Sequence, residues 1–149
     1  MSDAAHAPTM GRFDGKTHIL PVRVYYEDTD VSGIVYHANY LRLMERGRSE
    51  ALRLAGVHHM VMMSGEEPVA WTIRRVAIEY IRPARLDDAL EVHTRYNTLA
   101  GARLTGEQWV KRDGVDLITA KIEAALITMT GKPRRIPEDV KTKLAPYLD

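Results

Sequence analysis

The chain contains no cysteine. Without thiols it can have no disulfide framework, and a cysteine nucleophile is excluded from any chemistry it performs. This absence is compatible with a cytosolic protein, because the reducing cytosol does not sustain structural disulfides.

A strong excess of one charge and long apolar runs are also missing. The 149 residues carry a formal net charge of +1, which gives no general reason to expect a nucleic-acid partner. No apolar run approaches the ~20 residues that a membrane-spanning helix requires, so we expect a soluble protein. Residues 1–17 lack the apolar core of a secretory signal and are expected to form a flexible N-terminal tail. The remaining residues, 18–149, suit a single domain.

The sequence predicts one strand, one long helix and then four further strands. Residues 19–26 are rich in Val, Ile and Tyr, and apolar residues recur at helical spacing over residues 40–55, where Gly56 offers a stop. A connector that can hold a short helical turn follows, and Pro137 can open a final short helix. The four later strands are expected at residues 69–80, 90–99, 103–111 and 117–129.

Tight turns join the later strands, and Asp113-Gly114 is a clear hairpin signal. Short connections favour antiparallel neighbours, because a parallel pair needs a long crossover. We therefore expect an α+β protein in which one antiparallel sheet wraps around one central helix, the hotdog arrangement. Pairing of sheet edges between two chains would cover an open edge, so we also expect a homodimer or a tetramer built from two dimers.

The most informative segment is the acidic loop that joins the first strand to the helix, residues 25–40. A carboxylate in this loop faces a helix N-terminus, where free backbone N–H groups and the helix dipole favour negative charge. This pattern offers both parts of an acyl-transfer site, namely an acid or nucleophile and an oxyanion pocket.

Three segments resemble, in the correct order, the 4-hydroxybenzoyl-CoA thioesterase family of hotdog-fold enzymes. The similarity is strongest to its Tol-Pal-associated acyl-CoA thioesterase branch, and it covers roughly residues 19–140. The main departures are Val31-Ser32, where the branch often has Ala-Gly, and a longer N-terminal tail. The matching residues are Asp30, Gly33, Val35, Tyr36, His37, Asn39 and Tyr40, then Met44-Glu45-Arg46, residues 81–88 and residues 131–137.

The resemblance implies hydrolysis of an acyl-CoA to a carboxylic acid and CoA, without a cofactor. It assigns Asp30 as nucleophile or general base, and it assigns the oxyanion pocket to backbone N–H groups around Tyr36 and His37. Gly33 would allow the tight backbone path, and the His37 side chain would hold Asp30 or a water, or assist the departing thiolate. Without the resemblance, an Asp before a helix is most often a cap or turn former.

CoA carries several phosphate charges, so its site should include Lys or Arg near an open groove. The same side chains could instead form a solvated rim, or meet an acidic acyl-carrier protein or anionic lipid headgroups. The weak candidates are Arg82, Arg85, Lys132, Arg134 and Arg135.

Two other patterns are set aside. His58-His59 with the following methionines resembles a soft-metal site but specifies no coordination geometry, so we predict no metal. Glu45 lies three residues before Arg48, a spacing typical of an ion pair on a helix surface, and it stays outside the predicted catalytic set.

Several alternatives stay open at this point. A non-catalytic acyl-carrier or lipid-synthesis scaffold could keep the same fold. A magnesium-dependent phosphatase also fits the Asp28-Thr29-Asp30-Val31 motif, but it needs repeated strand–helix crossovers, and the His/acid arrangement of hotdog dehydratases is not found. The resemblance suggests a bacterial cytoplasmic protein near the inner membrane. The sequence does not choose among acyl groups, or between nucleophilic and general-base attack.

Overall fold

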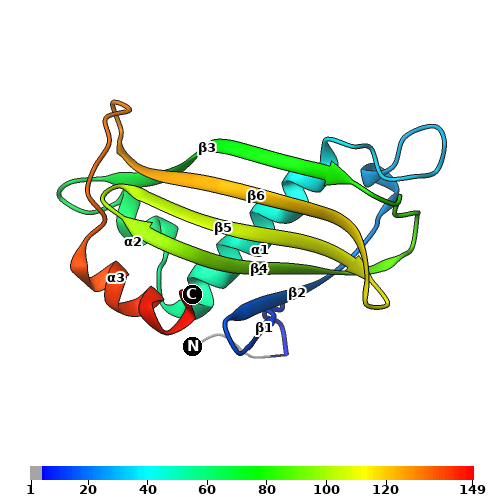
Figure 1. The fold of residues 1–149 in the computed structure, drawn as a ribbon, viewed down its shortest axis with the longest axis horizontal. Helices are drawn as coiled ribbons and strands as arrows, with labels where there is room; N and C mark the ends of the chain where they lie inside the picture. Colours follow the sequence, from blue (N-terminus) through cyan, green and yellow to red (C-terminus); the bar gives the residue numbers. More distant parts are fainter. Residues whose placement is uncertain (1–4) are drawn as a thin grey trace.

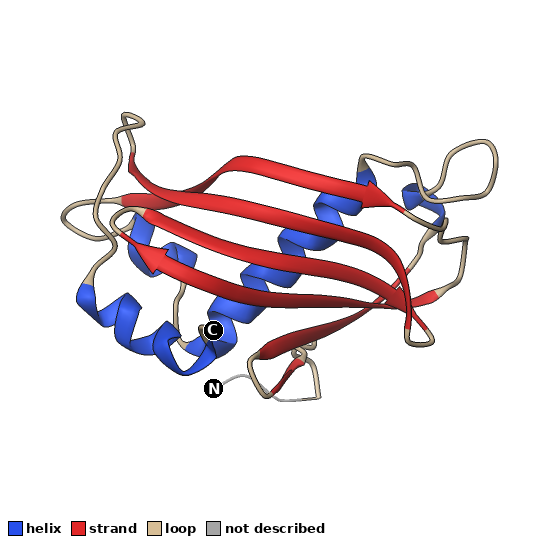
Figure 2. Cartoon of the chain, viewed as in Figure 1, coloured by secondary structure: helices blue, strands red, loops and turns tan. Residues whose placement is uncertain are grey.

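One antiparallel sheet, with a long helix packed against one face, forms the body of the molecule (Figures 1 and 2). The structure is a computed structural model and describes residues 5–149. The six strands lie in the order β1-β2-β4-β5-β6-β3, so the predicted hotdog α+β arrangement is confirmed. The strands are β1 (Arg12–Asp14), β2 (Thr17–Arg23), β3 (Val69–Tyr80), β4 (Ala89–Ala100), β5 (Arg103–Arg112) and β6 (Val115–Thr128). The helices are α1 (Asn39–Ala55), α2 (His59–Met63) and α3 (Glu138–Leu144), with the 3-10 turns η1 (Tyr26–Asp28) and η2 (Ala145–Tyr147).

The central helix α1 buries one face and ends where the sequence predicts. Gly56 adopts a left-handed conformation with a φ of 97°, and its N–H group donates to the carbonyl of Arg53. Gly47 lets the helix approach the sheet closely, since a Cβ at this position would lie 2.6 Å from Cγ1 of Val92. The buried residues of α1 are Tyr40, Leu43, Met44, Gly47, Ala51 and Leu52.

A buried polar group ties α1 to the sheet. The Gln108 side chain on β5 is fully buried, and its amide donates to the Met44 carbonyl and to the Thr94 hydroxyl, each at 2.9 Å. Its amide oxygen accepts a hydrogen bond of 2.9 Å from Arg48. Because both the amide nitrogen and the amide oxygen of Gln108 are hydrogen-bonded, this buried polar side chain does not destabilise the core. Its hydrogen bonds fix the position of α1 on the sheet.

The helix does not cover the whole inner face of the sheet. It packs mainly against β2 and β4, while β3 lies at the far edge and pairs with β6 alone. Ile73 and Tyr80 on β3 are consequently 38% and 47% exposed. An uncovered, partly apolar edge strand of twelve residues is a natural place for a second chain to pair.

The hairpin predicted at Asp113-Gly114 is confirmed. Both residues have positive φ angles, 51° and 77°, and they join β5 to β6 at the closed end of the ladder. Positive φ at both central residues is the feature that makes Asp-Gly favourable in such turns.

The N-terminal segment differs from the sequence prediction. Within the expected tail, residues 12–14 form β1 and pair with β2, and Phe13 stacks on Tyr147 with ring centroids 3.8 Å apart. His18 adds a hydrogen bond of 2.7 Å between its Nε2 and the Met10 carbonyl. Part of the segment expected to be a flexible tail thus pairs with the sheet and packs against the C-terminal end of the chain. Residues 1–4 of the expected tail lie outside the described residues.

Candidate active site

The loop that carries Asp30 is a narrow hairpin that projects beyond the end of the sheet (Figure 1). The Asp30 N–H donates to the Ile34 carbonyl at 3.0 Å, and the Gly33 N–H returns to the Asp30 carbonyl at 3.1 Å. Gly33 has a φ of 79°, a conformation that residues with a Cβ rarely adopt. The predicted role of Gly33 in shaping the loop therefore agrees with its backbone conformation.

The Asp30 carboxylate is exposed and oriented by its own loop. Its Oδ1 accepts hydrogen bonds from the Ser32 N–H at 2.8 Å and from the Ser32 hydroxyl at 2.5 Å. These two bonds hold the pKa of Asp30 below its usual value, and the bond from the Ser32 hydroxyl makes the larger contribution. The carboxyl group is therefore ionised at neutral pH. They leave Oδ2 without a protein partner in the described part of the chain, and an ionised oxygen of this kind can act as a base or nucleophile.

The N-terminus of α1 supplies backbone N–H donors, but they are not all the ones predicted. The N–H group of Tyr36 already donates to the Asp28 carbonyl at 3.0 Å. Its expected role as an oxyanion donor is therefore wrong. The next two N–H groups, of His37 and Ala38, have no acceptor within residues 5–149, and no side chain caps α1. These two are the donors available to a developing negative charge.

The His37 side chain is exposed and is positioned by aromatic neighbours. Its ring lies 4.5 Å from the Tyr36 ring and meets the Tyr80 ring edge-on at 6.1 Å, measured between centroids. The Tyr80 hydroxyl donates to the His37 carbonyl at 3.0 Å and so fixes the backbone beside the free N–H groups. No hydrogen bond joins His37 to Asp30 among residues 5–149, so a direct hold on the carboxylate is not part of this geometry.

A cavity of about 320 Å³ opens beside His37. Tyr40 and Tyr80 contribute aromatic walls, and the Tyr40 hydroxyl accepts a hydrogen bond of 2.9 Å from the Ala84 N–H. The Asp30 hairpin is joined to the same region, because the Val35 N–H donates to the Ala84 carbonyl at 2.9 Å. The full lining consists of Ile34, Val35, His37, Tyr40, Tyr80, Ile81, Arg82 and Pro83.

The basic residues predicted to bind CoA fall into two groups at opposite ends of the sheet. Arg82 lines the His37 cavity. The backbone of Arg85 forms an isolated β-bridge with Ile34 in the Asp30 hairpin. The group formed by Lys132, Arg134 and Arg135 lies on the connection between β6 and α3, at the other end of the sheet in Figure 1. Arg134 is also paired with Glu67 at 2.7 Å. The five candidates therefore do not lie together within a single chain.

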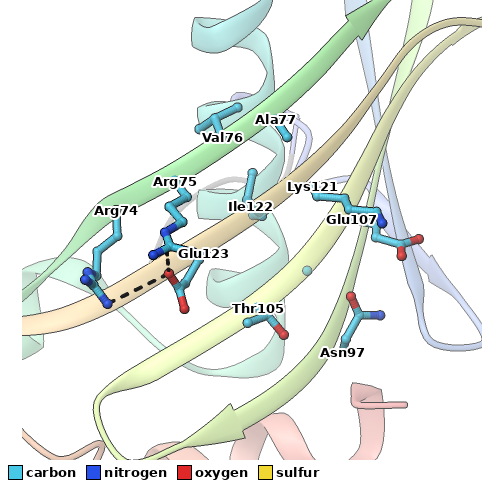
Figure 3. Close-up of a pocket in the computed structure, with 11 residues that line it drawn as sticks. Arg74, Arg75, Val76, Ala77, Asn97, Thr105, Glu107, Lys121, Ile122 and Glu123 are labelled. Carbon is cyan, nitrogen blue, oxygen red and sulfur yellow. Dashed lines mark ion pairs between the residues drawn. The ribbon is translucent and has the colours of Figure 1, made fainter.

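A wider hollow lies elsewhere, on the face of the sheet opposite α1 (Figure 3). It has a volume of about 760 Å³, and its lining includes the charged side chains of Arg74, Arg75 and Glu123. Arg75 and Arg74 approach the same carboxylate oxygen of Glu123 at 3.7 and 3.8 Å. Its lining contains neither Asp30 nor His37.

The histidines and methionines after α1 do not form a metal site in the described residues. His58 precedes the short helix α2 and His59 begins it, and no group of three or more His, Asp or Glu side chains within residues 5–149 could hold an ion. Nor does any helix in that part of the chain combine the length and apolar character that a membrane span needs.

Residues 24–144 match the family described as the thioesterase-like superfamily. The chain belongs to this family. The resemblance drawn from the three sequence motifs is thus confirmed at the level of the family.

Two relatives match most of their own length. The protein named acyl-CoA thioesterase YbgC in Haemophilus influenzae is 39% identical over 123 residues, which are 82% of this chain and 90% of that protein. The protein named acyl-CoA thioester hydrolase YbgC in Escherichia coli O157:H7 is 39% identical over 122 residues, 80% of this chain and 90% of that protein.

Solved structures give the same fold. A probable thioesterase from Bartonella henselae superposes with a TM-score of 0.79 at 46% identity, covering 81% of this chain and 99% of that chain. A protein of Aquifex aeolicus superposes with a TM-score of 0.78 at 29% identity, covering 85% of this chain and 98% of that chain. The family therefore extends over the Asp30 hairpin, α1 and the sheet together.

Two contributors to the site were missed by sequence analysis. Ser32 orients Asp30, and its position two residues later is the pattern of a turn closed by an Asp side chain, which could have identified it. Tyr80 comes from the end of β3, 43 residues after His37, and no local pattern brings these two together.

Proposed function

We propose that this chain hydrolyses the thioester of an acyl-CoA to a carboxylic acid and free CoA. The observation that carries the proposal is the ionised, turn-held Asp30 carboxylate on a hairpin joined to the uncapped entrance of α1. The family of the chain and the printed activities of its two YbgC relatives support the same reaction.

The thioester carbonyl is electrophilic, and its thiolate leaves readily. Hydrolysis therefore needs only a carboxylate and donors that stabilise the oxyanion. Asp30 either attacks the carbonyl carbon, giving a mixed anhydride that water then cleaves, or takes a proton from a water that attacks instead. In both routes the carbon–sulfur bond breaks and CoA leaves as a thiolate that is then protonated. The N–H groups of His37 and Ala38 would stabilise the oxyanion, and each such donor is typically worth roughly 3–4 kcal/mol. In this mechanism the imidazole of His37 would protonate the departing thiolate.

We assign CoA binding to both basic groups, provided by two copies of the chain. Pairing of β3 with β3 of a second copy in antiparallel fashion brings the start of one strand to the end of the other. Lys132, Arg134 and Arg135 lie beside the start of β3, since Val69 pairs with Thr128, whereas Arg82 follows its end. A homodimer, alone or as half of a tetramer, would thus assemble the CoA site from two copies. One copy would provide Arg82 and Arg85, and the other would provide Lys132, Arg134 and Arg135.

The setting that we propose is the bacterial cytoplasm near the inner membrane. An acidic acyl-carrier protein is a plausible second partner, because its charge complements the same basic residues. No cofactor takes part in this chemistry, since the carboxylate and the backbone donors supply what thioester hydrolysis requires.

Thiol release from a panel of acyl-CoAs, short to long and aromatic, tests the proposal when EDTA is present. Asp30→Asn keeps the size and removes the charge, and we expect it to lower kcat by roughly 10²–10⁴-fold. Asp113→Asn is a matched control, because Asp113 also lies in an exposed hairpin but at the β5–β6 turn. A wild-type protein that binds acyl-CoA without releasing thiol would favour the scaffold function instead, and equal rates for wild type and Asp30→Asn would exclude the assigned role of Asp30.

A further inference from the structure

The connection between β3 and β4, residues 81–88, crosses one end of the sheet. The two strands are consecutive in the chain, but β6 and β5 lie between them in the sheet (Figure 1). The connection begins against β6, since the N–H groups of Ile81 and Arg82 donate to the Leu117 carbonyl at 2.9 and 3.2 Å. Among the described residues no strand of the sheet pairs with residues 83–86, so other contacts must hold them in place.

The Asp30 hairpin is hydrogen-bonded to the middle of this connection. The Val35 N–H donates to the Ala84 carbonyl at 2.9 Å, and the Leu86 N–H donates to the Gly33 carbonyl at 3.4 Å. These two bonds lie on either side of the turn that carries the carboxylate. The position of the hairpin is therefore set by the position of the connection.

The same connection also contacts α1. The Ala84 N–H donates to the hydroxyl of Tyr40 at 2.9 Å, and Tyr40 is buried in the first turn of α1. One residue of the connection thus bonds to the Asp30 hairpin through its carbonyl and to α1 through its N–H group. A shift of the connection would change how the hairpin lies relative to the N-terminus of α1.

An ion pair attaches this connection to the end of β5. Arg112 is the last residue of β5, and its Nη1 donates to Oδ2 of Asp88 at 2.7 Å and to the Pro83 carbonyl at 3.3 Å. Oδ2 of Asp88 also accepts a hydrogen bond of 2.8 Å from the Arg85 N–H. One guanidinium therefore holds both ends of the segment from residue 83 to residue 88.

The pair of Asp88 and Arg112 is charged and partly shielded from water. The exposed fraction of the side chain is 23% for Asp88 and 33% for Arg112. Burial opposes ionisation of Asp88, but the Arg85 N–H and the Arg112 guanidinium outweigh it and keep the pKa of Asp88 below its usual value. Hydrogen bonds between charged groups are shorter than neutral ones and about twice as strong. The connection is consequently held most firmly at this pair.

We propose that Arg112 and Asp88 are positioning residues for thioester hydrolysis: their ion pair fixes the connection, and thereby the place of the Asp30 carboxylate opposite the free N–H groups of α1. Neither side chain lines the His37 cavity, so neither is expected to touch the substrate. A misplacement of about 1 Å far from the chemistry can lower a rate roughly 10²-fold, which makes such a support matter. This inference rests on the proposed function and adds two residues to its machinery.

Steady-state hydrolysis by variants that remove one charge at a time tests this role. Asp88→Asn keeps an acceptor for the Arg85 N–H, and Arg112→Gln removes the guanidinium. We expect either change to lower kcat about 10–100-fold while KM stays within about twofold. The double variant should be no slower than the slower single variant, because the two side chains act as a unit. Arg112→Lys keeps the charge and should recover part of the lost kcat.

Lys111→Gln is the matched control. Lys111 pairs with Asp116 at 3.3 Å in the same β5–β6 hairpin, and among the described residues no hydrogen bond joins either of them to the connection. This variant should keep the wild-type kcat. If Asp88 and Arg112 only stabilised the fold, their variants would melt at lower temperature and keep the wild-type kcat below that temperature. That result, or an equal loss of kcat in Lys111→Gln, would overturn the proposal.

Amide hydrogen exchange separates this inference from the proposed function, because it needs no acyl-CoA. The Val35 N–H reports on the bond between hairpin and connection, and the Gly56 N–H at the other end of α1 is the internal reference. We expect Arg112→Gln to speed exchange at Val35 about tenfold and to leave Gly56 unchanged. If Val35 exchanges faster although the wild type releases no thiol, the hold on the hairpin stands and the hydrolytic function fails. Unchanged exchange at Val35 in a chain that hydrolyses acyl-CoA would show the positioning role to be wrong.

Discussion

At the scale of single residues, the Asp30 site depends on local hydrogen bonds more than on burial. Asp30 is exposed, so its charge state is not forced by a low dielectric environment. Ser32 provides the two strongest of the hydrogen bonds that favour the ionised form, and both engage the same carboxylate oxygen, Oδ1. Loops of this kind can hold a reactive group firmly, because the Asp side chain and the backbone close the turn together.

Replacement of Ser32 should change the pH dependence of the reaction. The Ser32 hydroxyl makes the largest contribution to the low pKa of Asp30, so Ser32→Ala should raise that pKa towards its usual value. Because Asp30 must be ionised to act, the acid limb of the kcat/KM profile should move to higher pH, with the rate near neutral pH largely retained. Ser64→Ala, which removes a hydroxyl bonded to the Met60 carbonyl, is the control. An acid limb that stays in place would contradict the assignment of that limb to Asp30.

At the scale of elements, the sequence predicts α1 and the four later strands to within two residues or fewer at each end. Their signals are local: apolar spacing for α1, and turn residues such as Asp113-Gly114 between strands. β1 was missed because three residues carry little pattern of their own. Its order comes from packing, such as the stacking of Phe13 on Tyr147 from the other end of the chain.

The difference between local sequence signals and tertiary packing also explains which parts of the candidate site could be predicted. Asp30 and Gly33 could be predicted because a motif and a turn mark them. The engagement of the Tyr36 N–H by the Asp28 carbonyl could not, because it depends on how the 3-10 turn η1 folds back over the loop. The position of the two basic groups at opposite ends of the sheet follows from the strand order, because successive antiparallel strands reverse direction and the connections after β3 and β6 then leave from opposite ends.

The close contact of α1 with the sheet gives a stability prediction at this scale. Gly47→Ala improves helix propensity by about 1 kcal/mol, but its Cβ would lie 2.6 Å from Val92 Cγ1 and 3.0 Å from Thr94 Oγ1. Overpacking of a core typically costs about 1–3 kcal/mol, which exceeds or offsets this gain, so the free energy of unfolding should fall by up to about 2 kcal/mol overall. Denaturant unfolding measures this change. Gly65→Ala is the control, because its Cβ would meet nothing closer than 3.9 Å. Stabilisation by Gly47→Ala would show that α1 can move away from β4 at little cost.

At the scale of the whole molecule, the groups of the proposed thioesterase site lie at opposite ends of the sheet. One end carries Asp30, the free N–H groups and Arg82, and the other carries Lys132 and Arg134. The open edge of β3 lies between them. If two chains pair along β3, each end of one chain lies beside the complementary end of the other. Both ends of each chain can then contribute to a complete site.

Mixed dimers test this arrangement directly. Asp30→Asn removes the carboxylate, whereas Lys132→Ala combined with Arg134→Ala removes cations at the other end, and each protein alone should hydrolyse acyl-CoA poorly. A dimer with one copy of each contains one site with intact Asp30 and intact Lys132 and Arg134, because the site takes these from different chains. Differently tagged chains, co-expressed and purified through both tags, should therefore recover about half of the wild-type kcat per dimer. If each site were built within one chain, every site in the mixed dimer would carry a defect, and no activity would return.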